Sequence, residues 1–379
     1  MVEGCSYSFK EVKTVCCDSN FCNQIDSILT DITSIDNFTI IKKNPQTELW
    51  KGKYQNDNVA IKCYMPGASS SWERELKIYK SASSRNNNIL RYIGADISRY
   101  YYCIVFDYYD NQSLYDFLRC PKNSMFGLSL NQIYMIAYTA SKGLSYLHSN
   151  IFGADPKPTI CHRDIKSKNI LIKSICGNLN ATINLTPIPR NKYQSDHCIN
   201  YTKDSNLNKS NNNDKTYCSI NCCISDLGLA ITDDEDYSSI KLKVGTHRYM
   251  SPEILSETLD RLNFESFKMS DVYSFALVLW EIISCYNPFY PNPPFKLNCF
   301  HELPYHEFVS QNPSLDDMKT IVVDKNLRPS LQFNWYKSEK ILPFLEIIKE
   351  SWSSNPKSRL SAIRIKLTLQ KSCSGMSII

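Results

Sequence analysis

Residues 162–169, His-Arg-Asp-Ile-Lys-Ser-Lys-Asn, constrain this chain more than any other stretch of its sequence. The stretch lies between an apolar helical run and a strand-like apolar run at 170–172. Within it, Asp164 supplies a carboxylate, Lys166 an ammonium group and Asn169 a carboxamide. A carboxylate can accept the proton of an attacking hydroxyl, a cation can offset the charge of a moving phosphoryl group, and an amide oxygen can hold a metal ion. The stretch therefore predicts phosphoryl transfer.

The spacing of these residues resembles the catalytic loop of protein kinases, His-Arg-Asp-x-x-x-x-Asn. A second motif, Asp226-Leu227-Gly228, follows an apolar strand-like run and resembles the metal-binding Asp-Phe-Gly triplet of kinases. Alone, such a triplet is usually an ordinary turn, but behind a catalytic loop it is informative. We therefore expect Asn169 and Asp226 to hold Mg²⁺ or Mn²⁺.

A lysine on a predicted strand, Lys62, fits the kinase lysine that pairs with nucleotide phosphates. A lone lysine on a strand is more often a solvated side chain, so the test is a glutamate on a following helix. Residues 71–79 have apolar side chains at i, i+4 and i+7, which predicts that helix. We expect Glu75 to be the ion-pair partner of Lys62, and the alternative, Glu73, to point away from that face.

Composition narrows the class of protein. The chain has 379 residues, 42% of them hydrophobic, which is enough for one large domain or two. The net charge of +5 is mild, and no basic stripe carries interleaved aromatic residues, so nucleic acid is not an expected partner. No apolar run approaches the roughly 20 residues of a membrane span. The longest such run, 272–285, contains Glu281 and predicts a buried helix.

The second half of the chain carries further kinase-like features. Residues 244–253, Val-Gly-Thr-His-Arg-Tyr-Met-Ser-Pro-Glu, resemble the end of an activation segment. There we expect Glu253 to pair with a buried arginine, for which Arg359 is the candidate. Asp271 is expected to accept backbone N–H groups of the catalytic loop. It can equally be an aspartate favoured by the dipole at a helix N-terminus, and the two roles are compatible.

A closer resemblance covers about residues 49–369. The residues that carry it are 151–153, 157–158, 162–173, 226–230, 244–252, 312–318, 327–329 and 359–366. They are similar to the cytoplasmic kinase domain of transforming-growth-factor-β (TGF-β) superfamily receptors, nearer the type I than the type II receptors. Type I receptors themselves carry Asp-Leu-Gly, and Lys166 is the serine/threonine-kinase form of the loop.

The resemblance implies an α+β, bilobal kinase fold. A mainly β N-lobe with one key helix is expected at about 38–108 and a mainly helical C-lobe at about 113–372. It also implies a receptor serine/threonine kinase of TGF-β, activin or bone-morphogenetic-protein signalling that uses ATP. Smad proteins would be its substrates and a type II receptor its partner. Alignment places Phe106 at the gatekeeper position and assigns nucleotide contacts to Leu49, Ala60, Asp107 and Tyr109.

The same resemblance implies roles in the reaction. Lys62, fixed by Glu75, would orient the α and β phosphates of ATP, with Asp226 among the residues around the nucleotide. Asp164 would accept the hydroxyl proton and Lys166 would stabilise the transferred group. Thr246 would shape the pocket for the residue after the acceptor, or be a plain turn threonine.

The N-terminal residues depart from this family pattern. Residues 16–23, Cys-Cys-Asp-Ser-Asn-Phe-Cys-Asn, resemble the end of the receptors' disulfide-rich ectodomain, unless three cysteines in a polar stretch carry no meaning. We therefore expect an ectodomain remnant at 1–23 and a linker at 24–37. The family's transmembrane helix and Gly/Ser-rich segment are missing between them and the kinase, which suggests a spliced, truncated or misassembled product. Such a form is expected in the cytoplasm, whereas the family is membrane-bound. The remaining cysteines of the 16 are expected to be reduced and buried.

Two further stretches depart from the family. The three glycines of the phosphate-binding loop fall on Lys42, Asn44 and Thr47, and Pro45 lacks an N–H group. Either ATP binds loosely or this stretch belongs to the same faulty join, and a weak or pseudokinase-like docking module is the alternative function. Residues 175–220, rich in Asn, Ser and Lys, predict a disordered insertion.

Overall fold

The structure is a computed structural model that describes residues 35–82, 86–97, 100–110, 113–119, 127–154, 156–178, 216–237, 240–288 and 301–375. The chain divides into two compact units, one of residues 1–85 and 90–108 and the other of residues 86–89 and 109–379. The predicted ectodomain remnant, 1–23, and the linker up to residue 34 lie outside the described residues.

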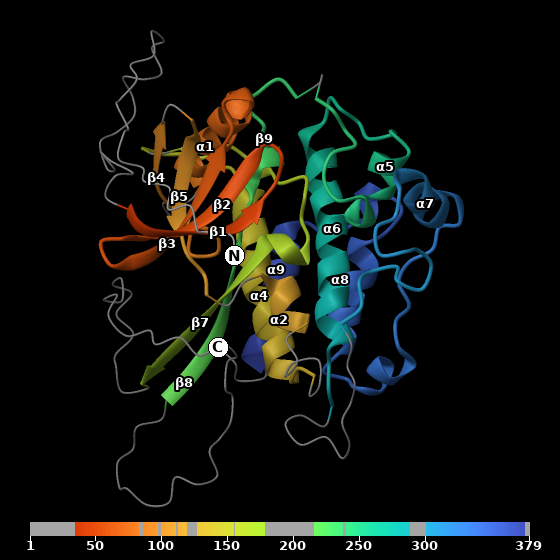
Figure 1. Cartoon of the computed structure of the whole chain (residues 1–379). Helices are drawn as coiled ribbons and strands as arrows, with labels where there is room; N and C mark the ends of the chain where they lie inside the picture. The colour runs from red at the N-terminus through yellow and green to blue at the C-terminus, as the bar shows by residue number, and fades with distance from the viewer. Residues whose placement is uncertain are drawn as a thin grey trace, which may run out of the picture. The chain divides into compact units, whose positions relative to one another are not determined.

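The first unit is built on one antiparallel sheet of five strands (Figure 1). In sheet order these are β1 (Ile35–Lys43), β2 (Thr47–Tyr54), β3 (Asp57–Tyr64), β5 (Tyr102–Asp107) and β4 (Tyr92–Ile97). Alternate residues of β3, namely Val59, Ile61 and Cys63, are buried in its core, as the two-residue period of a strand requires. Ile35 joins that core, so β1 begins within the predicted linker, and that part of the prediction is wrong.

Helix α1 (Ser69–Ala82) packs on this sheet through its apolar face. The indole N–H of Trp72 donates to the carbonyl oxygen of Cys103 on β5, at 3.2 Å. The ring of Tyr79 lies 4.7 Å from that of Phe106, measured between centroids. The helix predicted at 71–79 is therefore confirmed, and the strand of Lys62 and the helix of Glu75 belong to one packed unit.

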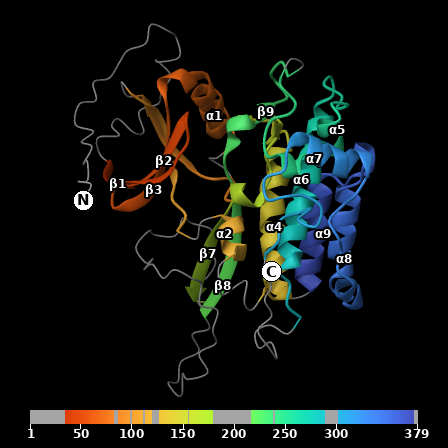
Figure 2. The same ribbon diagram turned by 45° about the vertical axis from the view of Figure 1, so that its right-hand side comes forward.

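The second unit is mainly helical. Its longest helices are α4 (Leu130–Leu147), α6 (Phe264–Ser284), α8 (Leu342–Ser351) and α9 (Ala362–Gly375), which Figure 2 shows side by side. Shorter helices are α2 (Leu114–Arg119), α5 (Pro252–Leu255) and α7 (Leu315–Lys319), and single turns or short irregular helices lie at 167–169, 227–229, 247–249, 320–324, 333–337 and 356–358. A mainly β unit with one principal helix and a mainly helical unit are what the predicted α+β kinase fold requires, and the fold prediction is confirmed.

The apolar run 272–285 is the C-terminal part of α6 together with its cap, Cys285, and its prediction as a buried helix is confirmed. The helix begins at Phe264, so the alternative prediction that Asp271 lies at a helix N-terminus is wrong. Ser129 begins α4 in a capping box, because its side chain accepts from the backbone of Gln132 while the side chain of Gln132 accepts from Ser129. In α6, every residue from 271 to 283 is buried, including Glu281. Within the part of the chain that the structure describes, no helix is both long and apolar enough to cross a membrane.

Two short strand pairs complete the second unit. Strand β6 (Ile160–Cys161) pairs with β9 (Ile231–Thr232), and β7 (Ile170–Asn178) pairs with β8 (Thr216–Ile224). The β7–β8 ladder runs from Ile170 opposite Ile224 to Asn178 opposite Thr216. The predicted disordered insertion is therefore wrong at both ends, because the backbone groups of 175–178 and 216–220 continue the ladder. Residues 179–215 lie outside the described part.

The buried side chain of Lys157 forms hydrogen bonds at the C-terminal end of α4. Its side chain is 1% exposed, and its ammonium group donates to the carbonyl oxygens of Leu147, Ser149 and Pro158 at 3.0, 2.7 and 2.7 Å. The last carbonyl groups of a helix have no partner within the helix, so Lys157 supplies one. Burial lowers the pKa of Lys157 to about 8 from its ordinary value of 10.5.

A pH dependence of stability follows from this lysine. Since its pKa is lower in the folded chain than in the unfolded chain, the unfolded chain binds more protons between pH 8 and 10.5, and stability from this group rises with pH there. Chemical denaturation gives the free energies of unfolding of the wild type and of Lys157→Met. The value for the wild type minus that for the variant should rise by up to about 1 kcal/mol per pH unit above pH 8. The control Lys325→Met removes an exposed lysine and should show no such shift. A constant difference between pH 7 and 9.5 for Lys157→Met would contradict the assignment.

Candidate active site

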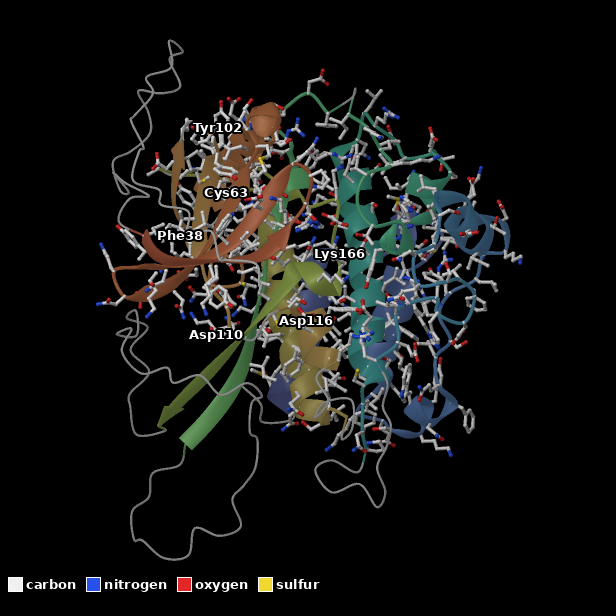
Figure 3. All side chains as sticks on the ribbon, in the orientation of Figure 1. Phe38, Cys63, Tyr102, Asp110, Asp116 and Lys166 are labelled. Atoms are coloured by element: carbon white, nitrogen blue, oxygen red, sulfur yellow. The ribbon has the colours of Figure 1, made fainter. Side chains whose placement is uncertain are left out.

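Asp164 is the centre of the hydrogen bonds made by the predicted catalytic segment, residues 162–169. It is 9% exposed and lies between β6 and the single turn at 167–169 that leads into β7. One carboxylate oxygen, Oδ1, accepts from the backbone N–H and the hydroxyl of Thr246, at 2.9 and 2.8 Å. The other, Oδ2, accepts from Lys166 Nζ at 2.5 Å and from Asn169 Nδ2 at 3.1 Å. The structure thus brings together four of the residues singled out from the sequence; Figure 3 labels Lys166 among them.

Asp271, on α6, fixes the backbone of the same segment. Its carboxylate accepts from the backbone N–H groups of His162 and Arg163 at 2.7 and 2.8 Å, and His148 Nε2 lies 3.0 Å from it. Burial acts to raise the pKa of Asp271, but the hydrogen bond and charge of His148 and the neighbouring His162 lower it below the usual value. A carboxylate that stays ionised can hold both N–H groups at once.

The two residues predicted to hold a metal ion start from adjoining backbone. The backbone N–H and the hydroxyl of Ser225, which precedes Asp226, donate to the carbonyl oxygen of Asn169 at 2.9 and 3.1 Å. Asn169 uses its amide nitrogen on Asp164, so the amide oxygen is the atom that could bind a metal ion. Asp226 is exposed and has a left-handed backbone, with φ of 64°. A carboxylate and an amide oxygen are the hard donors that Mg²⁺ and Mn²⁺ prefer, so the residues fit such an ion.

In the first unit, Lys62 and Glu75 form an ion pair. Lys62 Nζ lies 3.0 and 2.8 Å from the two carboxylate oxygens of Glu75, which is 1% exposed, whereas Glu73 is exposed. The hydroxyl of Tyr64 also donates to Glu75. Burial raises the pKa of Tyr64 well above its ordinary value, so its hydroxyl remains a donor. Tyr64 was missed from the sequence, although it stands two residues after Lys62 and so on the same face of β3.

The residues predicted to contact the nucleotide lie on β2, on β3, at the end of β5 and just after it. Leu49 on β2 lies opposite Lys62, and Ala60 precedes Lys62 by two residues, so these side chains share one face of the sheet. The carboxylate of Asp107 receives two hydrogen bonds from Arg91, at 2.8 and 2.7 Å. On β5, Asp107 lies opposite Val59, the residue before Ala60. Tyr109 belongs to the second unit.

The β1–β2 turn stands where a glycine-rich loop would be. The strands pair up to Lys43 opposite Glu48, whose side chains lie 2.7 Å apart, and residues 44–46 form the turn. The backbone N–H of Asn44 donates to the carbonyl oxygen of Thr47 at 2.8 Å. Lys42 lies at the end of β1, and Thr47 opens β2.

Glu253 and Arg359 form a buried pair. Two guanidinium nitrogens of Arg359 donate to the two carboxylate oxygens of Glu253, each at 2.7 Å. The same guanidinium donates to the carbonyl oxygens of Met269 and Ser353, each at 2.8 Å. All three nitrogens of the guanidinium meet acceptors, which favours burying such a charge. The pair joins α5, α6 and the turn before α9.

A second buried carboxylate supports the catalytic segment and was not predicted to do so. Glu281 is fully buried and accepts from Ser167 Oγ at 2.8 Å and from the hydroxyl of Tyr249 at 2.6 Å, and His301 Nε2 lies 2.9 Å from it. Burial and the charge of Glu281 raise the pKa of Tyr249 well above its ordinary value. In the sequence, Glu281 could be recognised as a single carboxylate inside an apolar helix, but its hydrogen-bond partners could not be predicted.

Comparisons with known proteins agree with this geometry. The family model of the protein kinase domain matches residues 47–368. The chain is 32% identical over 336 residues to TGF-beta receptor type-1 of Homo sapiens, which covers 86% of this chain and 55% of the relative. It is also 32% identical over 341 residues to activin receptor type-1B of Homo sapiens, covering 88% and 56%.

The chain spans about half the length of the curated relatives it matches. The resemblance to type I receptors that its motifs predicted is confirmed by these matches. Since the family model extends from the second strand of the sheet to the last helix, this chain belongs to the protein kinase family.

Proposed function

We propose that this chain is a serine/threonine protein kinase that transfers the γ-phosphoryl group of ATP to hydroxyl groups of a protein. The observation that carries the proposal is the Asp164 carboxylate, which Thr246 and Asn169 hold in place beside the ammonium group of Lys166. A fixed carboxylate with a cation beside it is what proton removal from a hydroxyl and charge stabilisation in phosphoryl transfer require.

Each residue has one task in the proposed reaction. Asp164 accepts the proton of the substrate hydroxyl, and Lys166 stabilises charge on the transferred group. Lys62, held by both oxygens of Glu75, orients the α and β phosphates of ATP. A divalent cation on Asn169 and Asp226 would neutralise phosphate charge.

The substrate class rests on the relatives. Their names tie them to TGF-β and to activin, and they are receptors. We therefore assign this chain to that class of signalling, with Smad-like proteins as substrates and a type II receptor as the partner. By the same reasoning, the kinase would act on the cytoplasmic side of a membrane as part of a single-pass receptor.

One observation favours a second function, a docking module that binds partners without phosphoryl transfer. The backbone N–H of Asn44 is used within the β1–β2 turn, and Pro45 has none. Two N–H groups that a glycine-rich loop would offer to phosphates are therefore not available, and ATP affinity would fall by roughly tenfold or more.

The first test removes the proposed base. In Asp164→Asn, we expect kcat for phosphorylation of a Ser/Thr substrate protein to fall by roughly 10²–10⁴-fold, because the amide cannot accept the proton. Mg-ATP binding should be unchanged within about twofold. Asp324→Asn changes an exposed aspartate and should retain full activity. Unchanged turnover in Asp164→Asn would remove Asp164 from this role.

The second test separates the two functions. Millimolar Mg-ATP should raise the melting temperature of the wild type, because a ligand at 100 times its dissociation constant adds about 2.7 kcal/mol of stability. Lys62→Met should lose most of that shift, measured against its own melting temperature without nucleotide, and Lys53→Met, at an exposed position of β2, should keep it. If the wild type shows no shift, the docking module is the better account.

A further inference from the structure

Two cysteines face each other in the core of the first unit. Cys63 on β3 lies directly opposite Cys103 on β5, and their sulfur atoms are 3.0 Å apart. Both side chains are buried, at 2% and 1% exposed. Figure 3 labels Cys63 and Tyr102, the residue before Cys103. As predicted, cysteines of the described kinase part are free and buried, but this pair is also in sulfur-to-sulfur contact.

The backbone geometry suits a bond between them. Directly opposed residues of an antiparallel pair have Cα atoms about 4.5–5.5 Å apart, which lies within the range of about 4.4–6.8 Å found across disulfides. A disulfide bond is about 2.05 Å long, so the two sulfur atoms need to approach by only about 1 Å. Side-chain rotation can supply such a movement without a change of strand register.

We propose that Cys63 and Cys103 are an oxidation site, at which a small two-electron oxidant such as hydrogen peroxide forms a reversible intrachain disulfide. One thiol sulfur attacks the peroxide, so that the thiol becomes a sulfenic acid and one water is released. The second thiol then attacks the sulfenic sulfur and releases another water. Two thiols and one hydrogen peroxide thus give one disulfide and two waters, and a dithiol reductant reverses the change.

The surroundings act on both steps. The hydrogen bond with Cys63, together with burial, raises the pKa of Cys103 well above its ordinary value. Either sulfur can be the one that peroxide oxidises, and the other then resolves the intermediate. With its partner 3.0 Å away, the sulfenic acid should close to the disulfide rather than oxidise further.

The bond would lie beneath the ion pair of the first unit. Cys63 follows Lys62 on β3, and the carbonyl oxygen of Cys103 accepts from Trp72, on the same helix as Glu75. The crosslink therefore ties the strand of Lys62 to β5 and, through Trp72, to the helix of Glu75. The two cysteines are 40 positions apart, so the closed loop is long enough to stabilise the unit appreciably.

Peptide mapping tests the bond directly in the full chain. Trypsin releases Cys63 in peptide 63–74 and Cys103 in peptide 100–119, and each peptide carries one cysteine. After treatment with hydrogen peroxide and alkylation of the remaining thiols, non-reducing mass spectrometry should find these two peptides linked. Dithiothreitol should separate them. The melting temperature of the oxidised wild type should exceed that of the reduced protein by roughly 5 °C or more.

Three variants make the result specific. Cys63→Ser and Cys103→Ser should each lose the linked peptide and the peroxide-dependent gain in melting temperature, whereas Cys373→Ser, at a buried cysteine of the second unit, should keep both. The proposal is overturned if peroxide leaves peptides 63–74 and 100–119 unlinked in the wild type, whether as free thiols, as sulfinic acids or paired to other cysteines. This readout needs no kinase activity, so it stands apart from the proposed function.

Discussion

The active site depends first on one buried carboxylate, Asp271. Its two oxygens hold the backbone N–H groups of His162 and Arg163, the two residues that precede the proposed base. Arg163 has a left-handed backbone, with φ of 67°, which a non-glycine residue adopts only when its surroundings compensate. The hydrogen bonds that Asp271 accepts from His162 and Arg163 provide that compensation, and they fix the backbone that leads into Asp164.

Residues 244–253, which resemble the end of an activation segment, approach the backbone of the catalytic segment closely at Gly245. Gly245 has φ of 96°, and a Cβ atom on it would lie 2.7 Å from the carbonyl oxygen of Arg163. Only glycine permits that contact, which brings Thr246 to the Asp164 carboxylate. Tyr249 then reaches Glu281, which also holds Ser167 of the catalytic segment. The proposed base and the segment beside it are therefore positioned by the same helix, α6.

What the sequence could predict depended on how local the cause was. Lys62 and Glu75 could be paired because the resemblance to kinases implied a lysine–glutamate pair and helix periodicity favoured Glu75 over Glu73, and the catalytic segment carried its own spacing. The partners of Glu281 and His301 could not be assigned, because they come from distant elements whose packing no local pattern encodes. Tyr64, by contrast, had a local signal in its place two residues after Lys62 on the same face of β3. Strand ends were also missed at Ile35, Asn178 and Thr216, since pairing with a neighbouring strand, rather than composition, decides where a ladder stops.

The β7–β8 ladder has a consequence for how this chain can change. Asn169 and Asp226, the proposed metal ligands, flank its near end, where Ile170 lies opposite Ile224. The register of that end is set by the ladder itself, so the spacing of the two ligands does not depend on how many residues join Asn178 to Thr216 at the far end. A change in the number of residues between β7 and β8 therefore leaves the positions of Asn169 and Asp226 relative to each other unchanged. A kinase built in this way can gain or lose residues between its two most constrained motifs without altering the chemistry that they perform.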